Sequence, residues 1–177
     1  MRMFKYIPIV LVLLICGATA QETDIKVDKI SRATLVVHDM DNAVHLFRDV
    51  LGLKVSDVTS ITGENISKQM GYDENVTMKF AGVSGDEGSI SLALMSLENV
   101  NDNPQIKPSR LVAGSVVLVM STQHVQAIYE IVKAEGYTII SKPGIPFPRE
   151  GIKEQGINML FVGPGGAIIE LSKPSVR

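Results

Sequence analysis

The chain has 177 residues, of which 45% are hydrophobic and 20% are charged, and its formal net charge is −2. This composition is typical of a globular protein that is long enough to build one core. The charge balance is slightly acidic and shows no basic cluster. It therefore argues against nucleic acid as a partner, since that binding depends on Lys and Arg neutralising phosphates.

The first twenty residues, MRMFKYIPIVLVLLICGATA, have the pattern of a secretory signal peptide. Arg2 and Lys5 precede a short apolar segment, and small residues end the pattern at Ala20. The apolar segment is too short to span a bilayer, so we predict cleavage near Ala20 and export to the periplasm or the medium, with no stable membrane span. A lipoprotein signal at Cys16 is the second interpretation, and the bulky residue before that cysteine disfavours it. Because Cys16 is the only cysteine, the mature chain has no disulfide and no thiolate ligand.

Residues 29–97 have the pattern of a first structural module. The β-branched run at 33–37 predicts a strand. Apolar residues at helical spacing follow, and Gly52 is placed to end that helix. Three more strands are predicted, at residues 53–58, 76–83 and 89–97.

The same order of elements recurs in a second module, residues 111–174, after a linker at 98–110 that is rich in Asn, Asp and Pro. Residues 116–120 predict a strand, and Val125, Ile128, Ile131 and Val132 form the apolar stripe of a helix that ends at Gly136. Strand patterns then follow at residues 137–140, 158–162 and 167–172.

The repeat predicts an α+β fold in which two βαβββ modules pack into one domain with curved mixed sheets. The predicted domain covers residues 29–174. Its expected core includes apolar residues from both modules: Val36, Phe47, Leu51, Val117, Ile128, Phe161 and Ile169.

Two segments make the chain resemble the vicinal oxygen chelate (VOC) superfamily of glyoxalases, bleomycin-resistance proteins and extradiol dioxygenases. They are LVVHDMDNAVHLFRDVLGLKV at residues 35–55 and NMLFVGPGGAIIEL at residues 158–171. The resemblance implies a cleft between curved sheets. It does not fix the activity, because that superfamily contains both enzymes and binding proteins.

The resemblance also places divalent-metal ligands on the first and last strands of each module. In this chain the first-strand positions fall on Arg32 and Ser115, and the closing strands supply Glu170 and Leu92 or a neighbour of Leu92. Arg32 cannot bind a metal, because its guanidinium stays protonated. One carboxylate is too few for a stable site, which normally needs at least three protein donors. The sequence therefore predicts that the usual metal site is absent, and that only Glu170 matches a ligand position.

A carboxylate in an apolar strand needs a compensating partner. We expect Arg32 and Glu170 to face the same cavity and to pair, or to bind an anionic ligand there, with Ser115 nearby. The loop at 141–156 is expected to flank the cleft mouth, with Phe147 and Arg149 available to a ligand. A solvated loop on the far side is the alternative.

The predicted function is an exported VOC-fold protein that binds a small molecule in the cleft between its modules, without a cofactor. The alternative is a metal-dependent lyase, isomerase or dioxygenase of the glyoxalase superfamily, which would hold a divalent cation. A homodimer is also predicted, because the edge strands of open sheets need cover.

Overall fold

The computed structural model describes residues 31–73, 75–85, 90–100, 108–146, 148 and 150–176. The predicted signal peptide, Phe147 and Arg149 lie outside the described residues. Within the described part of the chain, no helix has the length and apolar character to cross a membrane.

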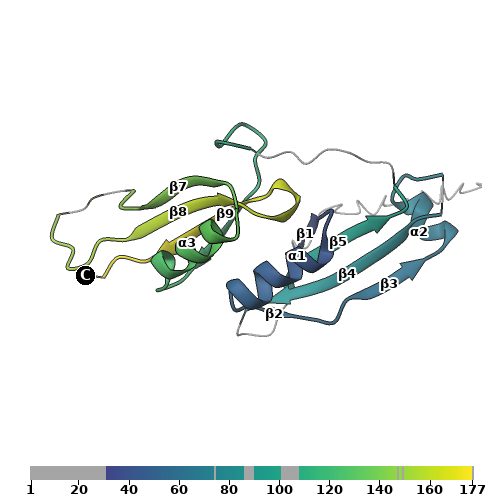
Figure 1. Cartoon of the computed structure of the whole chain (residues 1–177), viewed down its shortest axis with the longest axis horizontal. Helices are drawn as coiled ribbons and strands as arrows, with labels where there is room; N and C mark the ends of the chain where they lie inside the picture. Colours follow the sequence, from purple (N-terminus) through teal and green to yellow (C-terminus); the bar gives the residue numbers. More distant parts are fainter. Residues whose placement is uncertain are drawn as a thin grey trace, which may run out of the picture. The chain divides into compact units, whose positions relative to one another are not determined.

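The first module forms a mixed sheet with its helix against one face (Figure 1). Its strands follow the order β1-β5-β4-β2, with β3 paired to β4 and with β1 parallel to β5. The strands are β1 (Ala33–Val36), β2 (Lys54–Val55), β3 (Thr59–Thr62), β4 (Thr77–Ser84) and β5 (Ile90–Glu98). The helices are α1 (Met40–Val44), the π-helix η1 (His45–Val50) and α2 (Glu64–Gln69).

The second module repeats this plan in a four-stranded sheet of order β6-β9-β8-β7, with α3 packed against β7, β8 and β9 (Figure 1). Strands β6 and β9 are parallel, as β1 and β5 are in the first module. The elements are β6 (Val117–Ser121), α3 (Val125–Ala134), β7 (Ile139–Gly144), β8 (Ile157–Val162), the 3-10 turn η2 (Pro164–Gly166) and β9 (Ile168–Lys173). The predicted fold class is confirmed.

The helix of the first module begins at a side-chain cap. Asp39 is extended, and its carboxylate accepts a hydrogen bond from the backbone N–H of Asn42 at 2.9 Å. From His45 onward the helix widens into a π-helix, in which the N–H of Leu51 donates to the carbonyl of Leu46. Gly52 then leaves the helix at φ +72°, which a residue with a side chain adopts only with strain.

The core fills the space between each sheet and its own helix, and one apolar cluster contains residues of both modules. Four predicted core residues are buried, and Leu51 and Val117 are half-buried. The prediction for Val36 is wrong, because 58% of it is exposed. Its neighbour Leu35 points into the core, and side chains alternate along a strand, so Val36 lies on the opposite face. The confirmed four are Phe47, Ile128, Phe161 and Ile169.

Between β2 and β4 the first module holds two elements, β3 and α2, that have no counterpart among the described residues of the second module. Strand β3 has the sequence Thr-Ser-Ile-Thr, and all four residues are exposed. This sequence shows no alternation of apolar and polar residues, so the strand could not be predicted from it.

Candidate functional site

Strand register places Glu170 on the face of the second sheet that points away from α3. Glu170 lies opposite Val119 on β6 and Leu160 on β8, and directly paired residues share a face. The neighbouring Ile169 and Leu171 point the other way, into the core. We call the faces that point away from the module helices the open faces.

Glu170 is half-buried on its open face and is held by a short polar chain. The side-chain amide of Asn158 donates to Glu170 Oε1 at 2.5 Å, and the Ser172 hydroxyl donates to Asn158 Oδ1 at 3.0 Å. Asn158 and Ser172 are themselves register partners on β8 and β9. Among the described residues, the partner of the Glu170 carboxylate is therefore an amide donor and not a cation.

Replacing Asn158 with alanine tests this arrangement. The change removes the amide donor and leaves a half-buried carboxylate short of a partner, so the free energy of unfolding should fall by about 1–2 kcal/mol. Ser172→Ala is the matched control, since it removes a neutral hydrogen bond of the same chain and should cost about 0.5–1 kcal/mol. Urea unfolding followed by circular dichroism measures both. A smaller loss in Asn158→Ala than in Ser172→Ala would contradict the assignment.

Arg32 lies on the corresponding open face of the first module. Its guanidinium carbon is 5.0 Å from the centre of the Phe80 ring. Phe80 is the register partner of Met95, which in turn pairs with Val36, so these side chains share the face opposite the core. The exposed Arg32 thus covers an aromatic ring by a cation–π contact.

The predicted ion pair between Arg32 and Glu170 is wrong for the described residues. Their ion pairs do not include one between these two side chains, although both belong to the described part of the chain. The reason is positional: Arg32 precedes β1 of one sheet and Glu170 lies on β9 of the other, and each has a nearer partner in its own module.

Register also corrects the fourth expected metal-ligand position. Glu170 pairs with Val119 in the second module, and the equivalent pair in the first module is Met95 with Val36. Leu92 instead points into the core. The side chain equivalent to Glu170 is therefore the thioether of Met95, which is at most a weak ligand for the hard and borderline cations that carboxylates bind.

Ser115 lies two residues before β6, and its hydroxyl accepts a hydrogen bond from the backbone N–H of Val112 at 3.1 Å. The hydroxyl thus closes a local turn. Among the described residues, no group of three or more His, Cys, Asp or Glu side chains is arranged to hold a metal ion. The donor set at the ligand positions that the resemblance implies does not fit a divalent cation. These positions hold Arg32, Met95, Ser115 and Glu170.

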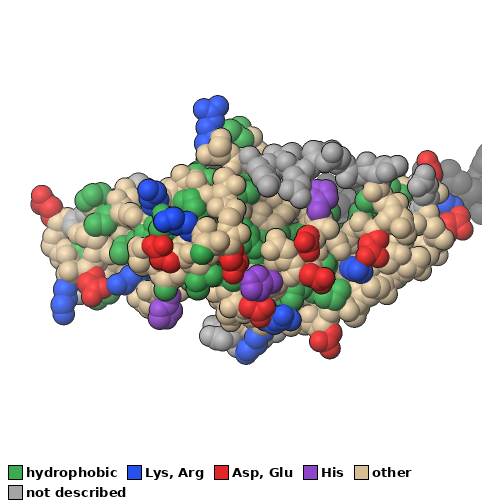
Figure 2. All heavy atoms as spheres, viewed as in Figure 1, with side chains coloured by type: hydrophobic (Ala, Val, Ile, Leu, Met, Phe, Trp, Pro, Cys, Tyr) green, Lys and Arg blue, Asp and Glu red, His purple; other side chains and the backbone are tan. Residues whose placement is uncertain are grey.

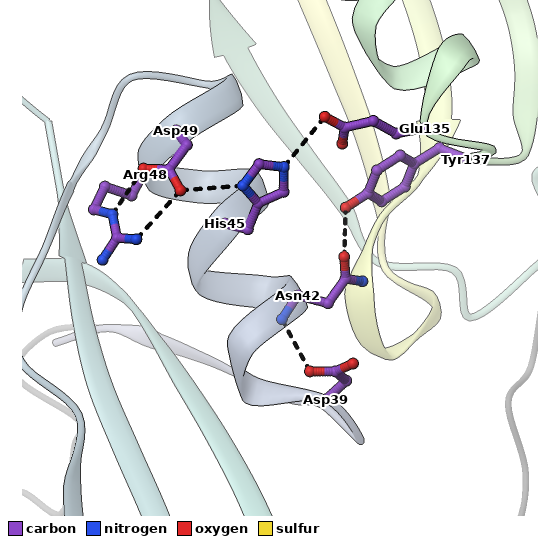
Figure 3. Close-up of polar contacts among 7 residues, drawn as sticks. All are labelled: Asp39, Asn42, His45, Arg48, Asp49, Glu135 and Tyr137. Atoms are coloured by element: carbon purple, nitrogen blue, oxygen red, sulfur yellow. Dashed lines mark hydrogen bonds and ion pairs between the residues drawn. The ribbon is translucent and has the colours of Figure 1, made fainter.

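A cavity of about 240 Å³ lies away from these residues, where the two modules meet. It is lined by the start of α1, by the segment from α3 to β7, and by the turn η2. Figure 3 shows two contacts beside it: the Tyr137 hydroxyl donates to Asn42 Oδ1 at 3.1 Å, and His45 contacts Glu135. Sequence reasoning missed this junction, because its partners are 90 residues or more apart in the chain. We place the candidate site at the open faces, where the ligand positions expected from the resemblance lie.

The visible face of the molecule carries charges of both signs. Figure 2 shows acidic, basic and histidine side chains interspersed on the visible face, with apolar patches between them. The basic side chains do not form one continuous area on that face. Charges of both signs therefore lie side by side on this face.

Comparison with known proteins agrees with this geometry. Residues 29–172 match the model of the Glyoxalase/Bleomycin resistance protein/Dioxygenase superfamily. A search of curated proteins found no match.

Solved structures share the fold at low identity. A glyoxalase family protein from Bacillus cereus has a TM-score of 0.67 at 15% identity, with 88% of this chain and 99% of that chain covered. A glyoxalase I variant from Zea mays has a TM-score of 0.54 at 19% identity, over 81% of this chain and 44% of that chain. A trypanothione-dependent glyoxalase I from Leishmania major has a TM-score of 0.50 at 16% identity, over 82% and 86% of the two chains. The fold and the family match together show that the chain belongs to the glyoxalase/bleomycin resistance protein/dioxygenase (VOC) superfamily.

Proposed function

We propose that this chain is an exported VOC-fold protein that binds a small organic molecule at its open faces without the divalent metal of its family. One observation carries the proposal. Three of the four positions at which the family places metal ligands hold Arg32, Met95 and Ser115, and the one carboxylate, Glu170, already accepts a hydrogen bond from Asn158. Export rests on the signal pattern of residues 1–20.

The residues of the open faces favour an anionic ligand with an apolar body. A guanidinium stacked on a ring keeps its in-plane N–H groups available to a carboxylate, sulfonate or phosphate. The guanidinium carbon of Arg32 lies 5.0 Å from the centre of the Phe80 ring, within the range of such a contact. Exposed valines, Val36 on β1 and Val119 on β6, supply apolar surface on the same faces.

Titration with the fluorescent probe 8-anilinonaphthalene-1-sulfonate tests the ligand chemistry, since the probe joins one sulfonate to an aromatic body. The probe should bind the folded protein, and Arg32→Gln should weaken binding several-fold by removing the cation that faces the sulfonate. Arg48→Gln is the matched control, because Arg48 is an exposed arginine on η1 that pairs with Asp49. Near-ultraviolet circular dichroism confirms that each variant is folded. Equal affinity in wild type and Arg32→Gln would contradict the assignment.

Metal analysis separates the proposal from the enzyme alternative. The purified, dialysed protein should hold no stoichiometric Zn, Ni, Mn or Fe, and Glu170→Gln should not change its metal content. A tightly bound metal that is lost in Glu170→Gln would contradict the proposal and favour the alternative, a metal-dependent lyase, isomerase or dioxygenase with rearranged ligands.

A further inference from the structure

His45 links the two modules through both nitrogens of its ring. Nδ1 lies 3.1 Å from Asp49 Oδ2, one turn along η1, and Nε2 lies 3.2 Å from Glu135 Oε1, just after α3 (Figure 3). We call these three side chains the His45 clasp. Asp49 belongs to the same module as His45 and Glu135 to the other, so only the second contact joins the modules.

The chemistry of imidazole makes this arrangement depend on charge. A protonated ring has two N–H donors and can donate to both carboxylates at once. A neutral ring has one donor, so its other nitrogen presents a lone pair to a carboxylate. The two carboxylates therefore favour the protonated form of the His45 ring. We infer that the His45 clasp is a pH-sensitive contact between the modules. Both hydrogen bonds form when the ring is protonated, and the clasp loosens when the ring is neutral.

Other charged groups lie on the elements that pack against η1. Arg48 donates to both oxygens of Asp49 and keeps that carboxylate ionised. On the side of α3, Lys133 lies over the Tyr129 ring at 5.5 Å, and the Tyr137 hydroxyl bonds to Asn42. On the side of β2, the charged residue is the exposed Lys54, and on α1 it is Asp41.

The directions of the pKa shifts of His45 and Asp49 set the pH range over which the clasp is closed. The hydrogen bonds to Glu135 and then to Asp49 raise the pKa of His45 above its ordinary value of 6.5. Hydrogen bonds from Arg48 and then from His45 lower the pKa of Asp49 to about 2. A raised histidine pKa stabilises the folded protein fully below 6.5, and this contribution is lost as the pH rises through the folded pKa. The Asp49 contribution is present above 3.8 and is lost only as the pH falls towards 2. The clasp is therefore closed in mild acid and opens as the pH rises through the raised pKa of His45.

Opening would change the junction cavity, because Glu135, Tyr137 and Asn42 line it. The Tyr137–Asn42 contact would then remain as a neutral link between the modules. The His45 clasp acts on the packing between the modules. It does not depend on which ligand binds at the open faces.

Two measurements on the full chain test this inference. In a histidine NMR titration, His45 should keep its proton to a pH above the ordinary histidine pKa of 6.5. Glu135→Gln should lower the titration midpoint of His45 while its hydrogen bond to Asp49 remains. An unchanged midpoint in Glu135→Gln would overturn the inference, because the shift would then be local to η1.

Hydrogen exchange measures how strongly the His45 clasp protects the backbone on both sides of the junction. After correction for intrinsic rates, peptides covering residues 39–46 and 133–140 should be better protected at pH 6 than at pH 8.5. The change in the opening equilibrium should be about tenfold for each unit by which the junction raises the pKa of His45. His45→Gln should abolish this pH dependence, and His124→Gln, the matched control, should retain it. The same pH dependence in His45→Gln and wild type would overturn the inference.

Discussion

Replacing Phe161 with alanine should lower the free energy of unfolding by about 3–5 kcal/mol, the usual cost of emptying a buried aromatic site. Phe161 is fully buried on β8. Its ring meets the Tyr137 ring edge to face, with centroids 5.9 Å apart at 81°. The alanine variant loses both the buried area and this aromatic contact, and the sheet around it cannot collapse freely because β8 pairs with strands on both sides.

Urea unfolding monitored by far-ultraviolet circular dichroism checks this value. Val119→Ala is the control, because Val119 is 64% exposed on the neighbouring open face and its truncation should change stability by about 0.5 kcal/mol or less. One apolar cluster contains residues of both modules, so Phe161→Ala should shift a single transition. Unfolding of the second module alone, with hydrogen exchange at Leu94 unchanged, would show that the modules are independent.

The regular elements could be predicted from sequence because each has a strong local signal. Helix α3 follows its apolar stripe, and β8 and β9 flank a glycine-rich turn. The face of a strand was harder to predict. A run of β-branched residues from Ala33 to Val37 predicts a strand, but only pairing with β5 decides that Leu35 enters the core and Val36 does not.

The candidate site was only partly predictable for the same reason. Glu170 stands out as a carboxylate in an apolar strand, and its need for a partner is correctly inferred. Its actual partner, Asn158, is set by the register of β8 against β9. The identification of Met95 instead of Leu92 also needs the register, since a shift of one residue reverses every face.

No local sequence pattern predicts the contact between His45 and Glu135. The two residues are 90 positions apart, and each looks like an ordinary exposed residue of a helix. Only the packing of η1 near the end of α3 brings them together. Sequence patterns describe elements well and describe contacts between modules poorly, because such contacts depend on tertiary packing that local periodicity does not encode.

Replacing Gly165 with alanine should cost about 2–5 kcal/mol of folding free energy, because two penalties combine. Gly165 has φ +68°, and an alanine there costs about 1–2 kcal/mol. An added Cβ would also lie 2.3 Å from the carbonyl oxygen of Val36, a backbone atom of β1 that cannot rotate away. Forcing the turn off β1 adds about 1–3 kcal/mol of overpacking.

Gly52→Ala separates these penalties. Gly52 has φ +72°, and an added Cβ would meet nothing within 4 Å, so this variant should lose only about 1–2 kcal/mol. The excess loss in Gly165→Ala, measured by urea unfolding, then reports the packing of the η2 turn against β1. Equal losses in the two variants would show that the turn is not held against β1.

The Gly165→Ala variant also tests whether the η2 turn and the His45 clasp belong to one cooperative junction. The η2 turn and Glu135 both line the cavity where the modules meet, so a turn displaced from β1 should also separate Glu135 from His45. In the Gly165→Ala background, His45→Gln should therefore have a smaller effect on stability at pH 6 than in wild type, because contacts at one junction are not additive. Full additivity of the two substitutions would show that the turn and the clasp act independently, and that the modules are joined at separate points rather than at one cooperative junction.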